Sequence, residues 1–237
     1  GDLGPTLDGQ ALPLWEAIYV TRGSRLEFDY RRTGCRAYLA VAGGFDVPPV
    51  LGSKSTYLRG GFGGFQGRAL RAGDVLTSGR ARVDLRRQEG KRLPQVKIPR
   101  YDDPDVAGVI LGPQDDCFTA QAVDAFLHSE YLVSSASDRM GYRLEGPLLI
   151  HAGATEIISE GVALGCVQVP ADGQPIILMV DRQAVGGYPK IATVVSADIP
   201  ALGQCFPGLS HVKFTPCTLE EARRRLAAQE ALLETVT

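Results

Sequence analysis

The chain has 237 residues, with 25 Lys and Arg against 27 Asp and Glu, so its formal net charge is −2. This length allows one large or two small domains, and a hydrophobic content of 44% excludes a disordered chain. The near-neutral charge gives no electrostatic reason to expect nucleic acid or an anionic membrane as a partner.

Glycine and proline are frequent, with 28 and 15 residues respectively. Both residue types favour turns, so they predict many short strands rather than long helices. The five cysteines contain no C-x-x-C pair, and their odd number gives no legible disulfide framework. We therefore expect a reducing, cytoplasmic setting. The longest purely aliphatic run, residues 176–180, is far shorter than the ~20 residues that span a bilayer.

The first half of the chain contains short stretches in which β-branched, aromatic and other apolar residues alternate or cluster. Such stretches predict strands, because these side chains pack well on a pleated surface. Turn sequences such as Leu7-Asp8-Gly9 and Ala72-Gly73-Asp74 separate them. The predicted strands of this half cover residues 14–21, 25–30, 37–42, 75–78, 83–86 and 96–98.

The second half shows the same alternation of short apolar stretches and turn sequences. Strands this short, with turns about every ten residues, predict a barrel or a sandwich rather than a doubly wound sheet. The predicted strands of this half cover residues 109–111, 131–133, 165–169, 176–180, 191–195 and 211–215.

Two segments have the apolar spacing of amphipathic helices. Residues 119–127 follow this spacing, with Thr119 as the N-cap. Residues 218–234 follow it as well, and Thr218 with Glu221 has the pattern of a capping box. We expect the second helix to close the fold.

Residues 80–100 are predicted to connect two domains. Eight of them are Lys or Arg, and Gly90, Pro94 and Pro99 interrupt the run. A basic run is also typical of a nucleic-acid contact, but no aromatic residue lies between these cations to stack on bases. We therefore favour a solvated ribbon between two domains.

Several familiar motifs are incomplete. The glycine-rich residues 60–67 have Gln66 where a dinucleotide-binding pattern needs glycine, and residues 51–55 lack the Gly-Lys pair of a phosphate loop. The three histidines lie too far apart to form a local metal motif, so no metal is expected. No G-x-S-x-G nucleophile elbow is present either.

Polar side chains gather instead in glycine-containing stretches at residues 137–147, 156–161, 165–170 and 181–190. Cations, amides and carboxylates are the groups that bind and polarise a small amide, urea or carboxylate. Glycine additionally permits close approach of the backbone. Turn chemistry and salt bridges are the alternative explanation of these residues.

Five stretches together resemble one known family. They are YLAVAGGF at 38–45, STYLRGGFGG at 55–64, GPQD at 112–115, DRMGYR at 138–143 and QVPADGQP at 168–175. The chain resembles the carboxyltransferase-like family that includes the C subunit of 5-oxoprolinase, allophanate hydrolase subunit 2 and the matching half of the urea carboxylase carboxyltransferase domain. Their order and spacing match along the whole chain.

The resemblance implies a mainly-β fold of two tandem cyclophilin-like β-barrels with a C-terminal helix. We place the first barrel at residues 1–95 and the second at residues 96–237. Members of the family usually begin with a further glycine-rich segment, so the first barrel is expected to be incomplete at its N-terminus. A recurring order of strand, glycine pair and turn in the two halves agrees with a tandem.

The resemblance also implies a role as one subunit of an enzyme. The expected partner is the B subunit or subunit 1 of the same system, with a third subunit in oxoprolinase-like members. There ATP drives the opening of 5-oxoproline to glutamate, whereas urea carboxylase transfers a carboxyl group from carboxybiotin to urea. We expect no cofactor bound directly by this chain, with ATP or biotin used by the complex.

Four residues are predicted to bind and polarise the substrate. Arg139 and Lys190 are the candidate catalytic cations for a carboxylate or a developing oxyanion. Gln168 and Gln183 are expected to orient a planar amide through donor and acceptor bonds. In the alternative interpretation, Arg139 and Arg143 pair with Asp138 and Glu145, and Gln168 satisfies the edge of a sheet.

Four further residues complete the predicted site. Asp181 and Glu160 are candidates for moving protons, provided that burial raises the pKa toward neutrality. Tyr188 and Arg59 are expected to contact the substrate. For these residues too, a purely structural role is the alternative.

Two other hypotheses compete with the enzyme subunit. Some relatives resemble antagonists of a protein that inhibits a sensor histidine kinase, which would make the chain a regulatory protein-binding module. The chain could also be a stable fragment without activity of its own. Unpaired strand edges would then make it self-associate into a homo-oligomer or depend on a partner.

Overall fold

The computed structural model describes residues 1–98 and 106–234. The end of the predicted basic ribbon, at residues 99 and 100, therefore lies outside the described residues. The strands are β1 (Pro5–Leu7), β2 (Gln10–Ala11), β3 (Leu26–Phe28), β4 (Val106–Leu111), β5 (Glu130–Val133), β6 (Gly141–Glu145), β7 (Glu160–Gly161), β8 (Cys166–Gln168), β9 (Ile176–Leu178), β10 (Val185–Gly186), β11 (Lys190–Val194) and β12 (His211–Pro216). The α-helices are α1 (Ala120–His128), α2 (Ile199–Leu202) and α3 (Leu219–Glu234).

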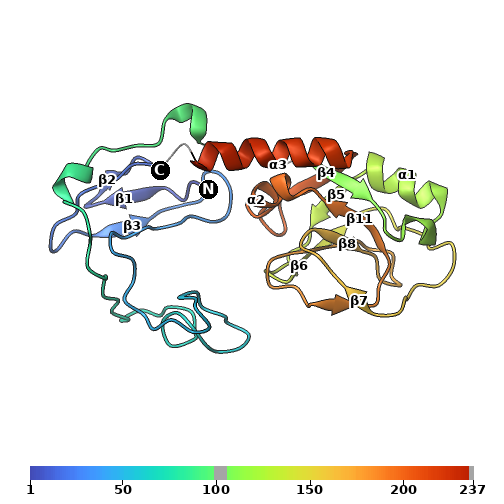
Figure 1. Ribbon diagram of the computed structural model, residues 1–237, viewed down its shortest axis with the longest axis horizontal. Helices are drawn as coiled ribbons and strands as arrows, with labels where there is room; N and C mark the ends of the chain where they lie inside the picture. The colour runs from blue at the N-terminus through green and yellow to red at the C-terminus, as the bar shows by residue number, and fades with distance from the viewer. Residues whose placement is uncertain (99–105, 235–237) are drawn as a thin grey trace. The chain divides into compact units, whose positions relative to one another are not determined.

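Seven strands close into a barrel in the order β11-β4-β12-β5-β6-β9-β8 (Figure 1). The pairs within it are antiparallel except β12 with β4, which is parallel. The ring is completed where β11, already paired with β4, also pairs with β8. Closure gives every barrel strand two neighbours, so no barrel strand offers an unpaired edge.

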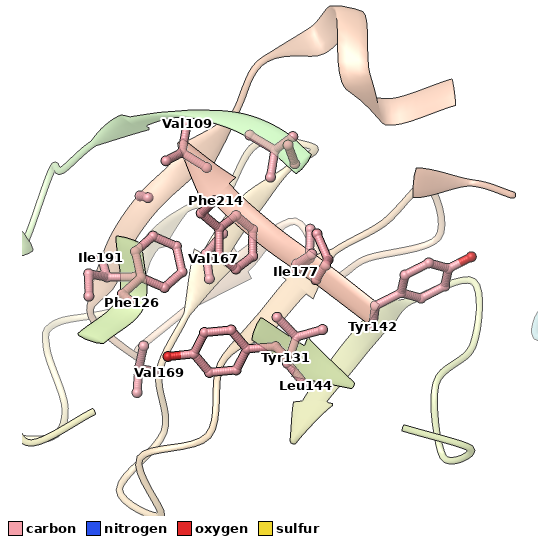
Figure 2. Close-up of a cluster of buried hydrophobic side chains, with 14 of the residues drawn as sticks. Val109, Phe126, Tyr131, Tyr142, Leu144, Val167, Val169, Ile177, Ile191 and Phe214 are labelled. Atoms are coloured by element: carbon pink, nitrogen blue, oxygen red, sulfur yellow. The ribbon is translucent and has the colours of Figure 1, made fainter. Parts of the chain in front are cut away.

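The interior of the barrel is packed with aromatic and branched aliphatic side chains (Figure 2). The rings of Phe126 and Phe214 stack with their centroids 4.3 Å apart, and Tyr131 lies at an angle to both. Val167 and Ile177, from paired strands β8 and β9, are fully buried beside them. Offset and tilted ring pairs add stability beyond the buried apolar area, so this cluster holds the barrel together.

Both predicted helices are present. The hydroxyl oxygen of Thr119 accepts a hydrogen bond from the Ala122 amide at 3.1 Å, which confirms Thr119 as the N-cap of α1. The hydroxyl oxygen of Thr218 likewise accepts from the Glu221 amide at 3.2 Å at the start of α3. The closed barrel and the C-terminal helix α3 together confirm the predicted mainly-β class.

The chain divides into two compact units. Unit 1 contains residues 1–12, 26–37 and 94–237, and unit 2 contains residues 13–25 and 38–93. Every buried hydrophobic side chain among the described residues belongs to unit 1, and the core of the barrel is built from residues between Ala107 and Phe214. The predicted boundary between residues 95 and 96 stays a prediction.

Unit 2, all of which is described, consists of turns, isolated β-bridges and one 3-10 turn. Its apolar side chains are largely in contact with solvent, with Tyr38 89% and Leu51 93% exposed. A strand needs a paired neighbour and a buried face, and these side chains have no such face within unit 2.

The strands predicted in the first half are therefore mostly wrong. Only residues 25–30 contain a strand, β3, which pairs with β1 in the three-stranded sheet β2-β1-β3. Residues 86–88 and 95–97 form 3-10 turns instead of strands. By contrast, all six stretches predicted in the second half coincide with barrel strands.

Gln204 ties the segment after β3 to the barrel within unit 1. Its side-chain oxygen accepts hydrogen bonds from the amides of Cys35 and Arg36 at 3.0 and 2.9 Å, and its nitrogen donates to the Arg36 carbonyl. The Arg36 guanidinium donates to the hydroxyl of buried Tyr142 at 2.9 Å.

Among the described residues, no helix combines the length and the apolar character that a membrane span requires.

We expect amide protons of the barrel strands to exchange far more slowly than those of residues 38–93. Hydrogen bonds around a buried core open only with the whole barrel, whereas unit 2 has no buried apolar side chain to protect it. Hydrogen exchange followed by mass spectrometry on the whole chain measures the exchange rates of the barrel strands and of residues 38–93. Equal protection of the two parts would contradict this.

Two buried tyrosines provide a matched test of the core. The Tyr131 hydroxyl has no hydrogen-bond partner among the described residues, and burial raises the pKa of Tyr131 to about 12. We expect Tyr131→Phe to raise the free energy of unfolding by about 1 kcal/mol, because an unpartnered buried hydroxyl is destabilising. Tyr142→Phe should lower it by about 1–2 kcal/mol, since it removes the acceptor of the Arg36 bond.

Urea unfolding of both variants gives these values. A comparable loss of stability in the two variants would show that the Tyr131 hydroxyl is stabilising after all.

Candidate active site

Lys190 begins β11 at the closing ladder of the barrel. In the pairing of β11 with β8, Lys190 lies opposite Gln168, and the register shifts by one residue before Ala192 lies opposite Val167. Such a β-bulge changes the direction in which side chains leave the strand, and bulges often lie beside functional sites. The bulge places two of the predicted site residues, Lys190 and Gln168, in register with each other.

The ammonium group of Lys190 is held by the carboxylate of Glu160. The Nζ and Oε1 atoms are 2.5 Å apart, and the Lys190 side chain is only 3% exposed whereas that of Glu160 is 45% exposed. Glu160 belongs to β7, which pairs with β10 in a separate two-stranded ribbon. Burial of an ammonium group is unfavourable unless a counter-charge is close, so this ion pair explains how Lys190 is accommodated.

The pKa of Glu160 is lowered from its ordinary value of 4.5. The causes are hydrogen bonds first from Lys190 and then from Gln114, together with the positive charge of Lys190. A role in moving protons near neutrality requires burial to raise this pKa. The opposite shift keeps Glu160 ionised, and the condition for that role is therefore not met.

Gln168 and Gln183 form the predicted pair of amides. Gln168 is 2% exposed, and its Oε1 atom accepts a hydrogen bond from Nε2 of Gln183 at 3.1 Å. Nε2 of Gln168 donates to the backbone carbonyl of Tyr188 at 3.4 Å. A Cβ atom on Gly186 would come within 2.6 Å of the same nitrogen, so glycine in β10 allows the ribbon to approach Gln168 this closely.

Gln114 is a member of this cluster that the sequence patterns do not single out. Its Nε2 atom donates to Oε1 of Glu160 at 2.7 Å, and its Oε1 atom accepts from the Lys190 amide at 3.2 Å. The only sequence signal is its place in the GPQD stretch at 112–115, directly after β4.

Lys190, Glu160, Gln168, Gln183 and Gln114 are hereafter called the Lys190 cluster. An ammonium group, an ionised carboxylate and three carboxamides lie within one network of hydrogen bonds and strand pairing. Together they offer donors for a carbonyl oxygen and acceptors for an amide N–H group. These are the kinds of group that bind and polarise a small planar amide.

Arg139 and Asp181 form a second group. Nε and Nη2 of Arg139 donate to the two carboxylate oxygens of Asp181 at 2.8 and 3.1 Å, and the Arg139 side chain is 58% exposed. The backbone joins them as well, since the Asp181 amide donates to the Arg139 carbonyl. A two-point pair of this kind fixes the guanidinium plane, and its partner, Asp181, is itself a predicted site residue.

Tyr188 and Arg59 are the two remaining predicted residues. Tyr188 contributes its backbone carbonyl to the Lys190 cluster, while its side chain is partly exposed. Arg59 is an exposed residue of unit 2.

A shallow hollow in unit 2 is lined by residues 80–83 and contains none of the predicted site residues. Within the described ranges, no group of three or more His, Cys, Asp or Glu side chains is arranged to hold a metal ion.

Comparisons with known proteins agree on one family. The model of the family described as "Carboxyltransferase domain, subdomain A and B" matches residues 1–216. The chain is 41% identical to the C subunit of 5-oxoprolinase from Escherichia coli over 229 residues, which is 96% of this chain and 71% of that protein. It is 33% identical to urea amidolyase of Saccharomyces cerevisiae over 250 residues, covering 98% of this chain and 13% of that protein.

A solved structure has the same fold. The crystal structure of urea carboxylase from Kluyveromyces lactis superposes with a TM-score of 0.90 at 29% identity, covering all of this chain and 22% of that protein. The chain thus spans less than a quarter of that enzyme and about seven tenths of the Escherichia coli protein.

The ion pair between Glu160 and Lys190 should make stability depend on pH. A carboxyl group with a lowered pKa in the folded state contributes stability fully above its ordinary pKa of 4.5, and the contribution is lost as the pH falls through the lowered value. We expect wild type to be more stable than Glu160→Gln near neutral pH, with the difference shrinking in acid. Denaturant unfolding at a series of pH values measures this.

Glu145→Gln, at an exposed carboxylate of β6, is the control and should not reproduce the trend. A difference between wild type and Glu160→Gln that stays constant from neutral to acid pH would contradict the expected ion pair.

Proposed function

This chain belongs to the family of the carboxyltransferase domain, subdomains A and B, and on that premise we propose that it is one subunit of an enzyme that acts on a small amide, lactam or urea. The reaction we favour is that of 5-oxoprolinase, in which the lactam of 5-oxoproline is opened to glutamate. The observation that carries this choice is the identity of 41% with the C subunit of 5-oxoprolinase across 71% of that protein.

The Lys190 cluster supports this proposal because it has groups that can bind and polarise a lactam carbonyl. In hydrolysis, the oxygen of water forms a bond to the carbonyl carbon, the ring C–N bond breaks, and a proton that the water loses is taken up by the leaving nitrogen. Negative charge develops on the carbonyl oxygen during the attack. An ammonium group has three N–H donors, so Lys190 can bind Glu160 and still donate to this oxygen.

The amides and the carboxylate orient the substrate in this proposal. Gln183, whose nitrogen is bound to Gln168, keeps its oxygen as an acceptor for the lactam N–H group. Glu160 is kept ionised by Lys190 and Gln114, which lower its pKa and suit it to accept a hydrogen bond rather than to donate a proton. Arg139, paired with Asp181, is assigned to the carboxylate of the substrate, which would share or replace that pair.

Carboxyl transfer to urea is the second candidate. It is favoured by the TM-score of 0.90 with urea carboxylase of Kluyveromyces lactis. Urea is a planar diamide, so the same donors and acceptors of the Lys190 cluster could bind it. The regulatory alternative receives no support, because the relatives described above are named as enzymes or as a subunit of one.

Partners and co-substrates belong to the same proposal. We assign the chain a partner that resembles the B subunit or subunit 1 of these systems, because the Escherichia coli relative is named as a subunit. ATP, or carboxybiotin in the second candidate, would be used by the complex, and we assign neither to residues of this chain. All five cysteines are free, which supports a reducing, cytoplasmic setting.

The test uses the chain in complex with this partner. ATP with 5-oxoproline, followed by the release of glutamate, measures the first activity, and carboxybiotin with urea measures the second. We expect Lys190→Met to lower the supported activity by at least about a hundredfold, because it removes the donor to the developing oxyanion. Lys213→Met, at an exposed lysine of β12 paired with Glu130, is the matched control and should retain activity.

Four outcomes are decisive. Glutamate release without urea turnover supports the 5-oxoprolinase reaction, and the reverse supports carboxyl transfer. No turnover of either substrate, or full activity of Lys190→Met, overturns the proposal.

A further inference from the structure

Gln114 is bound to Lys190 through both its backbone and its side chain. The Gln114 amide donates to the Lys190 carbonyl at 3.1 Å, and the Lys190 amide donates to Oε1 of Gln114 at 3.2 Å. The segment 112–115 therefore continues alongside β11 beyond the end of β4, since Gly112 also donates to the Ile191 carbonyl. These contacts hold the Gln114 carboxamide beside the bulge of the closing ladder.

The contacts to Lys190 decide which end of the carboxamide meets Glu160. Because Oε1 of Gln114 is occupied by the Lys190 amide, Nε2 is the end that faces the Glu160 carboxylate, at 2.7 Å. A flipped carboxamide would lose both bonds. Gln114 thus presents an N–H donor to Glu160, and donors bind an ionised carboxylate more strongly than a protonated one.

The same oxygen of Glu160 receives both donors. Oε1 of Glu160 accepts from Nζ of Lys190 and from Nε2 of Gln114. These are the two side chains whose hydrogen bonds lower the Glu160 pKa, and the charge that contributes is that of Lys190. With one oxygen fixed in this way, the direction of the carboxylate relative to the ammonium group is fixed as well.

We propose that Gln114 is a positioning residue, which holds the ionised carboxylate of Glu160 against Lys190 and so sets the direction in which the ammonium group donates to the substrate. This inference rests on the proposed function of the Lys190 cluster. Gln114 acts through Glu160 and Lys190, and its loss is expected to reduce turnover much more than substrate binding.

The first measurement is the pKa of Glu160 in the purified chain, by carbon-13 NMR of labelled glutamate carboxyl groups, with Glu160→Gln to assign the signal. Gln114→Met keeps the length of the side chain and removes its donor, so the Glu160 pKa should rise from its lowered value. Gln114→Glu keeps the shape and adds a competing carboxylate, so the pKa should rise further.

Gln174→Met is the matched control. The Gln174 carboxamide also makes two backbone bonds, accepting from the Gly146 amide and donating to the Gly146 carbonyl, and Glu160 is not among its partners. The Glu160 pKa should not change in this variant. If Gln114→Met and Gln114→Glu leave the Glu160 pKa at the wild-type value, the inference is wrong.

The second measurement is turnover of the complex with the partner assigned above. We expect Gln114→Met to lower kcat by roughly tenfold to a hundredfold with little change in KM, as a displaced catalytic group does. A raised Glu160 pKa together with unchanged kcat would overturn the positioning role. Full activity of Lys190→Met would instead overturn the proposed function, whatever the pKa shows, which keeps the two failures distinguishable.

Discussion

The pairing of β11 with β8 is the constraint on which the rest of the structure depends. Without it the seven strands would form an open sheet with two exposed edges, and the aromatic core around Phe126 and Phe214 would be accessible to water. The same ladder carries Lys190 and Gln168 on its first matched pair. The backbone hydrogen bonds that close the barrel also place two residues of the candidate site opposite each other, so a change in this ladder alters both.

Charge compensation is the second condition of the site. A lysine side chain that is 3% exposed requires a counter-charge, and Glu160 supplies it from a ribbon that is not part of the barrel. The two charges of the pair cancel, so the proposed binding of a neutral amide would depend on hydrogen-bond direction rather than on net charge. That is why the carboxamides, which each have one donor end and one acceptor end, matter as much as the charged groups.

The sequence was informative where burial is strong. Each of the stretches at 131–133, 176–180 and 211–215 contains a barrel strand and places apolar side chains in the closed core. The stretches at 14–21 and 37–42 look similar, but their side chains are not buried within unit 2 and no strand forms. The candidate site was predictable only in part, for a related reason. Lys190, Glu160, Gln168 and Gln183 stood out as polar residues in glycine-rich runs, whereas the role of Gln114 depends on a tertiary contact with β11 that no local pattern encodes.

Because of the bulge at the start of β11, the site depends on the number of residues in this strand as well as on their identity. A strand alternates its side chains between two faces, and the extra residue between Lys190 and Ala192 resets that alternation. A relative could therefore keep the lysine and both glutamines and still lack the cluster, if a single deletion in this strand straightened the ladder.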